Sequence, residues 1–279
     1  MRVFGVDFTS APDRRKSICV AACILDGDRL IFERLNRLRS LGAFEAALRE
    51  KGPWIAGFDF PFTQSRIFLR NIGWPEVWPV YAELIGRMDR QTFRAALEAY
   101  KADRDPGDRE HAREFERGSG AVSPQKLYGV PVALMQFEGT PRLLAAGLHV
   151  PGLVDGDPSR IAVEAYPGVA ARALIGRRPY KNDQRSKQTA DQAEARGELL
   201  RRLTGEPGRA RFGLSIEAPA RLAEDPGADP LDALLCAAQA AWALRLMEKE
   251  PERLARLDLS GGWIADPEVL DRLPLREGR

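Results

Sequence analysis

Five acidic residues stand where an apolar run ends or where a helix is expected to begin. A charge in or beside such a segment is costly unless it is paired or binds a metal ion. Where strands lie side by side, their ends bring these acids to one edge of a sheet, and the mutual repulsion raises a pKa or recruits a hard cation. The five residues are Asp7, Asp59, Glu164, Asp229 and Asp232.

The chemistry that these residues suit is oxygen-only coordination of a divalent cation. Carboxylate oxygens favour Mg²⁺ or Mn²⁺ over zinc. The two histidines, His111 and His149, both lie in expected loops, which argues against a histidine-rich zinc site.

Each acid also has a purely structural interpretation. Asp7 or Asp59 alone can cap a turn, and Asp229 suits the N-cap of a helix whose first residue is Pro230. Asp232 then completes a capping-box-like pattern. Residues three apart on a helix nevertheless face the same way, so Asp229 and Asp232 can also chelate one ion. Taken together, in this order along the chain, the five acids favour a site.

The N-terminal part of the chain predicts the elements that would position the first two acids. Asp26-Gly27 between two apolar runs is a strong hairpin signal. The expected order is therefore strand, hairpin, helix, strand. The elements are the strands 3–8, 17–25, 29–35 and 54–58 and the helix 44–48.

The segment 63–151 departs from this regular pattern, and we interpret it as an insertion within the domain. Its aromatic residues (Trp74, Trp78 and Tyr81) are expected to form core rather than to stack on bases, and a helix is predicted over 93–100. The stretch 101–117 is almost entirely charged, which indicates a solvated loop or helix face. Gly118 to Gly120 would form a flexible joint after it.

Regular structure returns in the C-terminal half, where the other three acids lie. Glu164 follows a short expected strand, and Asp229 opens a long helix that is apolar on nearly all sides, which predicts burial against a sheet. The expected elements are the strand 161–163 and the helices 169–174, 190–203 and 229–247.

Composition limits the class of protein. The 279 residues, 44% of them hydrophobic, suit one domain spanning 1–279. A formal net charge of +2 means that nucleic-acid affinity requires a local basic patch. The chain shows neither a secretory signal nor an apolar run long enough to cross a membrane, so we expect a cytoplasmic protein with no membrane partner. Its three cysteines, Cys19, Cys23 and Cys236, are expected to be buried thiols in a reducing compartment.

The order of elements and acids resembles the ribonuclease-H-like fold, and its spacing is closest to the Holliday-junction-resolvase branch. More narrowly, four motifs resemble the domain of unknown function 429 family, whose members are often described as predicted nucleases. These motifs are Gly5-Val6-Asp7, Gly57-Phe58-Asp59-Phe60-Pro61, Glu164-Ala165-Tyr166-Pro167 and Asp229-Pro230-Leu231-Asp232-Ala233.

The resemblance implies an α/β fold, a mixed sheet flanked by helices, and a metal-dependent nuclease. It implies that Asp7, Asp59 and Asp232 hold the metal, with Asp229 as a further ligand, and that Glu164 is a neighbouring ligand or a general base. The chemistry would be phosphodiester hydrolysis, in which two Mg²⁺ ions roughly 4 Å apart activate a water and stabilise the leaving oxygen.

A nucleic-acid substrate, DNA or RNA, would need cations near these acids. The strip from Arg172 to Lys187 is basic and contains Arg177, Arg178, Lys181 and Arg185 against one acid, Asp183. Tyr180 lies within it and suits stacking on a base, and Lys126 is a further candidate cation. An ordinary solvated basic loop explains the strip equally well.

Two other functions fit parts of the pattern. An actin-like-class nucleotide-binding phosphotransferase or ATPase would use residues 7–10 as a phosphate loop, but the usual glycine is missing there and no second copy of the domain follows. A non-catalytic ribonuclease-H-like binding module would use the acids as caps and ion pairs. A serine hydrolase is disfavoured because no G-x-S-x-G motif is present.

Overall fold

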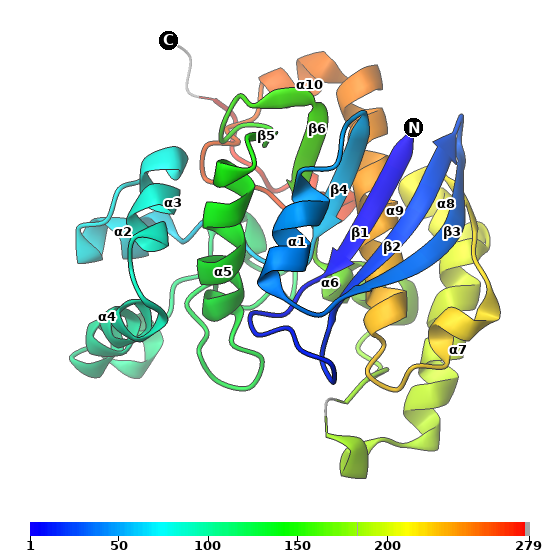
Figure 1. Ribbon diagram of the computed structural model, residues 1–279, viewed down its shortest axis with the longest axis horizontal. Helices are drawn as coiled ribbons and strands as arrows, with labels where there is room; N and C mark the ends of the chain where they lie inside the picture. The colour runs from blue at the N-terminus through cyan, green and yellow to red at the C-terminus, as the bar shows by residue number, and fades with distance from the viewer. Residues whose placement is uncertain (183, 277–279) are drawn as a thin grey trace.

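The computed structural model describes residues 1–182 and 184–276, which build a mixed seven-stranded sheet with helices on both faces (Figure 1). The sheet order is β5-β6-β4-β1-β2-β3-β7. The strands are β1 (Arg2–Asp7), β2 (Ile18–Asp26), β3 (Arg29–Leu38), β4 (Trp54–Phe58), β5 (Leu148–His149), β6 (Asp157–Glu164) and β7 (Ser215–Glu217).

The predicted order at the N-terminus is confirmed. β1, β2 and β3 form an antiparallel meander. The turn between β2 and β3 contains Gly27, whose φ of 60° is a value that glycine adopts without strain. Ser40 caps α1 (Leu41–Leu48) by accepting a hydrogen bond from the Ala43 amide at 3.1 Å. The chain then returns through β4, which pairs with β1 in parallel.

One face of the sheet carries the long helix α9 (Asp229–Lys249), as its apolar composition predicted. The helix packs directly on β1, β2 and β4. A β-carbon at Gly5 would collide with the backbone of Ala233 and Ala237, and one at Gly57 with the backbone of Cys236. These two glycines therefore set how closely α9 lies on the central strands.

Shorter helices and β7 complete this side of the molecule. They follow β6 in the chain. In the C-terminal region, Ile264 forms a parallel bridge with Glu164 at the end of β6. The helices are α6 (Pro167–Ile175), η3 (Arg185–Lys187), α7 (Ala190–Thr204), α8 (Glu206–Phe212), η4 (Ala220–Ala223), α10 (Pro251–Ala255) and α11 (Pro267–Leu270).

The opposite face is covered by α1 and by α5 (Val132–Ala145) (Figure 1). Beneath them lies a cluster of phenylalanines. Phe8 and Phe58 each pack against both Phe60 and Phe44, edge to face or tilted, with ring centroids 4.8–6.0 Å apart. The residues beside the two central aspartates therefore fix the ends of β1 and β4 from this face.

The segment between β4 and β5 is mainly helical and has a small core of its own. Trp78 and Tyr81 are buried, and Trp74 stacks on Phe93 with ring centroids 5.8 Å apart, so the core interpretation of these aromatic residues is confirmed. Besides α5, the segment contains α2 (Arg66–Ile72), α3 (Trp78–Gly86), α4 (Arg90–Ala102), η1 (Pro106–Asp108) and η2 (Glu114–Glu116).

The prediction of a solvated stretch over 101–117 is wrong for its last part. Arg113, Phe115 and Glu116 are all buried, at 3–4% exposure. Burial is tolerated because the Arg113 guanidinium has two carboxylate partners, Glu116 and Glu164. The helix cap predicted at Asp229 is wrong as well, because Ala228 is the N-cap residue and Asp229 already belongs to α9.

Two expectations from composition can be compared with the fold. All three cysteines are buried free thiols, as predicted. Over the described ranges, the chain has no helix with the length and apolar character of a membrane span.

Candidate functional site

Asp7 and Asp59 lie side by side at the carboxyl ends of two adjacent parallel strands. Val6 is the register partner of Phe58, and the Asp59 amide donates a hydrogen bond to the Val6 carbonyl at 2.9 Å. Because side chains alternate along a strand, Asp7 points to the same face as Gly5, which is the face that α9 covers. Asp7 is buried, and Asp59 is partly exposed.

The first turn of α9 brings two further aspartates over these strand ends. Ala228, with φ of 62°, turns the chain into the helix, and Asp229 and Asp232 follow in its first turn. Asp232 is fully buried and Asp229 is 8% exposed. The positive end of the helix dipole favours acids at this place. Four of the five predicted acids are therefore brought together.

Electrostatics reflect this crowding. Burial raises the pKa of Asp7 well above its usual range, and the charges of Asp229, Asp232 and Asp59 raise it further. Burial also raises the pKa of Asp59 to about 7, with Asp232 and Glu164 adding to the effect. In both cases the positive charge of Lys181 acts in the opposite direction.

Lysines pair with the two helix acids. Lys181 donates a hydrogen bond from Nζ to Asp232 Oδ2, and the Tyr180 hydroxyl donates to Asp232 Oδ1 at 2.8 Å. Lys16 Nζ donates to Asp229 Oδ1 at 2.9 Å. Within residues 1–182 and 184–276, by contrast, neither the Asp7 nor the Asp59 carboxylate has a hydrogen bond or an ion pair.

The donor set suits a hard divalent cation, because every carboxylate here supplies oxygen. In this arrangement, however, no three His, Cys, Asp or Glu side chains of the described residues already form a ready-made metal site. Asp232 and Asp229 face lysines, so Asp7 and Asp59 are the two acids left for an ion.

Glu164 is not part of this group. It is the register partner of Phe58, one position before Asp59, so its side chain points to the opposite face of the sheet. There it accepts hydrogen bonds from Arg113 Nη1 at 2.7 Å, from Arg113 Nη2, and from the Phe62 amide at 2.8 Å. Burial raises the pKa of Glu164, and Arg113 lowers it.

A cavity of about 310 Å³ opens beside Asp59 at these strand ends. Its wall combines residues that follow β4 and β6 with residues of the segment before α5, among them Lys126. The Lys181 side chain lines the cavity and also contacts Asp232. The principal lining residues are Asp59, Phe60, Arg113, Lys126, Met135, Glu164, Tyr166, Tyr180 and Lys181.

The predicted phosphate-binding residues divide into two groups. Lys126 and Lys181 line the cavity, whereas Arg178 pairs with Glu198 at 2.7 Å and with Glu194 at 3.1 Å on α7. Arg177 is exposed and is not part of the cavity wall.

The expectation that Tyr180 stacks on a base is not supported. Tyr180 is buried at 9% exposure, and its hydroxyl is bonded to Asp232, so the ring serves to hold the site. Asp183 and the side chain of Arg185 lie outside the described residues.

Two residues that pair with the predicted acids, Arg113 and Lys16, were not predicted from the sequence. Arg113 lies in the charged stretch 101–117, where nothing local distinguishes it from its exposed neighbours. Lys16 stands in a basic run between β1 and β2, and only the fold brings it to Asp229, 213 residues away. The partner that brings each residue to the site is distant in sequence, Glu164 for Arg113 and Asp229 for Lys16.

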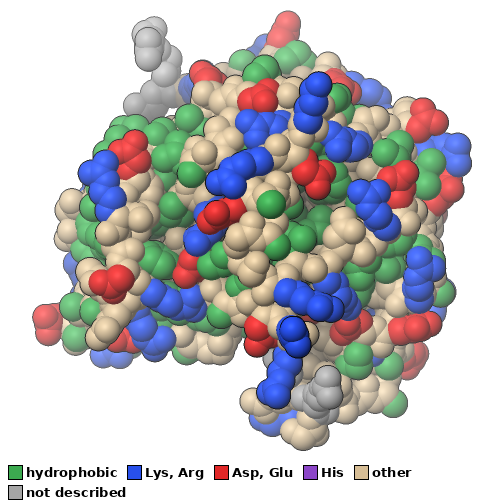
Figure 2. Space-filling model, in the orientation of Figure 1, with side chains coloured by type: hydrophobic (Ala, Val, Ile, Leu, Met, Phe, Trp, Pro, Cys, Tyr) green, Lys and Arg blue, Asp and Glu red, His purple; other side chains and the backbone are tan. Residues whose placement is uncertain are grey.

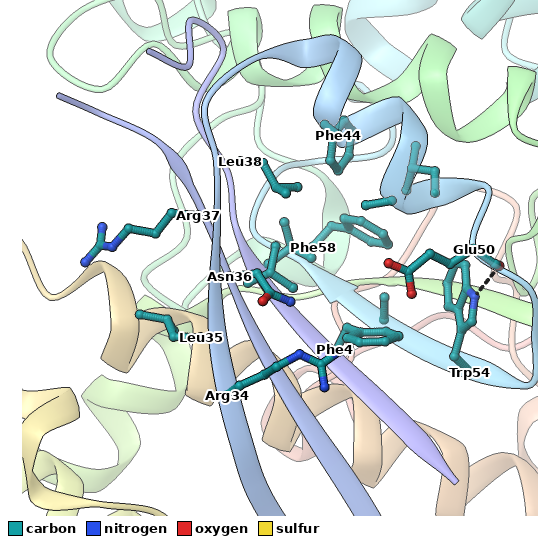
Figure 3. Close-up of a pocket in the computed structure, with 15 residues that line it drawn as sticks. Phe4, Arg34, Leu35, Asn36, Arg37, Leu38, Phe44, Glu50, Trp54 and Phe58 are labelled. Carbon is teal, nitrogen blue, oxygen red and sulfur yellow. Dashed lines mark hydrogen bonds between the residues drawn. The ribbon is translucent and has the colours of Figure 1, made fainter. Parts of the chain in front are cut away.

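A second cavity, of about 550 Å³, lies on the other face of the sheet beside α1 (Figure 3). Phe4, Phe44 and Phe58 form apolar walls, and Arg34 and Glu50 reach it from β3 and from the end of α1. Its lining includes none of the five predicted acids, so the cavity beside Asp59 is the candidate site.

Charge is mixed on the outer surface. Figure 2 shows lysine and arginine side chains interspersed with aspartate and glutamate over the face in view, in line with the formal net charge of +2. The cations that matter for the site are therefore the few that line its cavity.

A comparison with family models gives a match over most of the chain. The model of a family described as a protein of unknown function (DUF429) matches residues 5–250, a range that contains all five acids. Searches of curated proteins and of solved structures gave no match.

Proposed function

The chain belongs to the DUF429 family, as its motifs predicted, and we propose that it is a divalent-metal-dependent, nuclease-like phosphodiester hydrolase that acts on nucleic acid. We also propose that its mixed sheet is of the ribonuclease-H-like kind, with segment 63–151 inserted. The observation that carries the proposal is the pair Asp7 and Asp59 at adjacent strand ends beneath the acidic first turn of α9.

Asp7 and Asp59 are the residues that would hold Mg²⁺ or Mn²⁺. Such an ion polarises a phosphoryl oxygen and lowers the pKa of bound water. The chain supplies the remaining functions. Lys126 and Lys181 attract the phosphate, and the cavity of about 310 Å³ beside Asp59 receives the adjoining part of the substrate. Tyr180 holds Asp232 in place.

Thermal unfolding with EDTA, Mg²⁺ or Mn²⁺ tests the site without requiring a substrate. An ion that binds only the folded state raises the free energy of unfolding by about 2.7 kcal/mol at a concentration one hundred times its Kd. We expect Mn²⁺ to stabilise the wild type and to have no effect on Asp7→Asn or Asp59→Asn. The control is Glu217→Gln, which removes a surface ion pair with Arg29 at β7 and should respond to Mn²⁺ like the wild type.

The activity is tested on labelled DNA, RNA and branched DNA with Mn²⁺, using the same variants. Cleavage by the wild type and by Glu217→Gln, lost in Asp7→Asn and Asp59→Asn, is the expected result. Equal cleavage by Asp7→Asn would remove Asp7 from the mechanism.

A non-catalytic binding module is the second candidate. The pairing of Asp232 with Lys181 and of Asp229 with Lys16 favours it, because paired acids need no metal. This function predicts that millimolar Mn²⁺ changes the unfolding temperature of none of the proteins, so the same unfolding experiment separates the two.

A further inference from the structure

We propose that the site takes a single divalent cation, on Asp7 and Asp59, and that the ammonium group of Lys181 takes the place of a second cation at Asp232. This inference rests on the proposed function and specifies how many divalent cations that site binds.

The four aspartates differ in what their oxygens already contact. Both carboxylate oxygens of Asp232 accept hydrogen bonds, one from Tyr180 and one from Lys181, and its side chain is fully buried. Asp7, at 8% exposure, has no hydrogen-bond or ion-pair partner within the described ranges. A buried carboxylate of this kind either keeps its proton or pairs with a cation.

Two unpaired carboxylates suit one ion better than two. Mg²⁺ is commonly held by one or two carboxylates, with waters and substrate phosphates completing its shell. Asp7 and Asp59 supply that number from adjacent strands. A second ion would have to share Asp232, whose oxygens already serve Tyr180 and Lys181.

The charge of Lys181 acts on three of the four aspartates. Its charge is the strongest one that lowers the pKa of Asp7, of Asp59 and of Asp232 alike. Charge interactions weaken with distance, so the Lys181 ammonium, which donates a hydrogen bond to Asp232 Oδ2, also lies near Asp7 and Asp59.

The backbone at Tyr180 and Lys181 is held by hydrogen bonds. Arg196 donates a hydrogen bond to the Tyr180 carbonyl at 3.0 Å, and Gln192 donates to the Lys181 carbonyl at 3.3 Å, both from α7. The backbone that carries Lys181 is thus held by α7, and the partly exposed side chain is directed to Asp232 by its ion pair. The same side chain lines the cavity, so its charge faces the aspartates and a phosphate together.

Counting bound Mn²⁺ tests the inference independently of any activity. Isothermal titration calorimetry of the full chain, with free Mn²⁺ measured by electron paramagnetic resonance, gives the number of Mn²⁺ ions bound per chain. We expect one Mn²⁺ in the wild type and in Lys181→Arg, which keeps the charge, and two in Lys181→Met, which frees Asp232. Lys187→Met, an exposed lysine of the same segment, is the control and should bind one.

A second variant tests the inference even if Lys181→Met fails to fold. Asp232→Asn keeps an oxygen for the Tyr180 hydroxyl and removes the charge that Lys181 balances. We expect it still to bind one Mn²⁺, because the ion rests on Asp7 and Asp59, but more weakly than the wild type, because a neighbouring negative charge is lost. Loss of binding in Asp232→Asn, or two ions in the wild type, would overturn the inference. One ion in a folded Lys181→Met protein would overturn it as well.

Failure of the proposed function has a different signature. In that case the wild type binds no Mn²⁺ at all, whereas failure of the inference leaves Mn²⁺ bound with a different count or different ligands.

Discussion

At the scale of single residues, the site is defined by which acids are paired and which are not. Asp232 is buried with two donors, and Glu164 is buried with Arg113. Asp59 is partly exposed, with a pKa raised by burial to about 7. Its ionised form is therefore disfavoured in the folded protein when no cation is present.

The pH dependence of stability follows from this shift. An unfolded aspartate loses its proton near pH 4, whereas folded Asp59 keeps it to about pH 7. Between these values the folded state binds more protons, so the free energy of unfolding in EDTA falls as pH rises from 4 to 7. We expect Asp59→Asn to be more stable than the wild type at pH 8 by at least about 1 kcal/mol, the free energy of roughly one pKa unit.

Urea unfolding of both proteins at pH 4 and pH 8 checks this expectation. The two should differ little at pH 4, where folded Asp59 keeps its proton and is neutral like asparagine. An equal difference at the two pH values would show that the charge of Asp59 is not responsible.

At the scale of elements, the contact between α9 and the central strands decides the geometry of the site. Gly5 and Gly57 leave no room for a side chain beneath the helix. The aspartates at 229 and 232 reach the strand ends only because the helix lies this close.

We expect Gly5→Ala to push α9 from the sheet and to lower the free energy of unfolding by about 1–3 kcal/mol, the usual range for overpacking. The matched control is Gly42→Ala in α1, where a β-carbon has only the Ser40 hydroxyl nearby, at 3.9 Å. This change should stabilise by up to about 1 kcal/mol, because alanine favours helix. Urea unfolding of the two variants measures both changes in the free energy of unfolding. An unchanged free energy for Gly5→Ala would contradict the packing argument.

At the scale of the whole molecule, a buried ion pair joins segment 63–151 to the sheet. Arg113 belongs to the segment and Glu164 to β6, and both side chains are 3% exposed. The Arg113 guanidinium also bonds Glu116 at 2.6 Å and the Thr63 hydroxyl at 3.1 Å. This network is the charged contact that holds one wall of the candidate cavity.

Removing one partner leaves the others buried and uncompensated, a change that costs about 3–5 kcal/mol. We therefore expect Arg113→Met to be destabilised by this amount in urea unfolding, and the double variant Arg113→Met, Glu164→Gln to recover part of it. Arg117→Met, an exposed arginine of the same stretch, should change the free energy by less than about 0.5 kcal/mol. A similar small effect for Arg113→Met would contradict the role of the network.

The sequence by itself determined the N-terminal elements, the helix α9 and the acids beside them. Local signals were sufficient for β1 to β4 and α1, because alternation, the Asp26-Gly27 turn and short-range caps depend on neighbours in the chain. The all-round apolar character of α9 was sufficient to predict its burial against the sheet. The family also followed from short motifs at these positions.

Only the tertiary structure decided which charges meet. The register that turns Glu164 away from the aspartates, the burial of Arg113 and the pairing of Lys16 with Asp229 all join residues far apart in the chain. The short strands β5 and β7 likewise exist through their pairing with β6 and β3. A residue's partner across the fold is set by packing and register, which leave no mark on its own neighbourhood in the sequence.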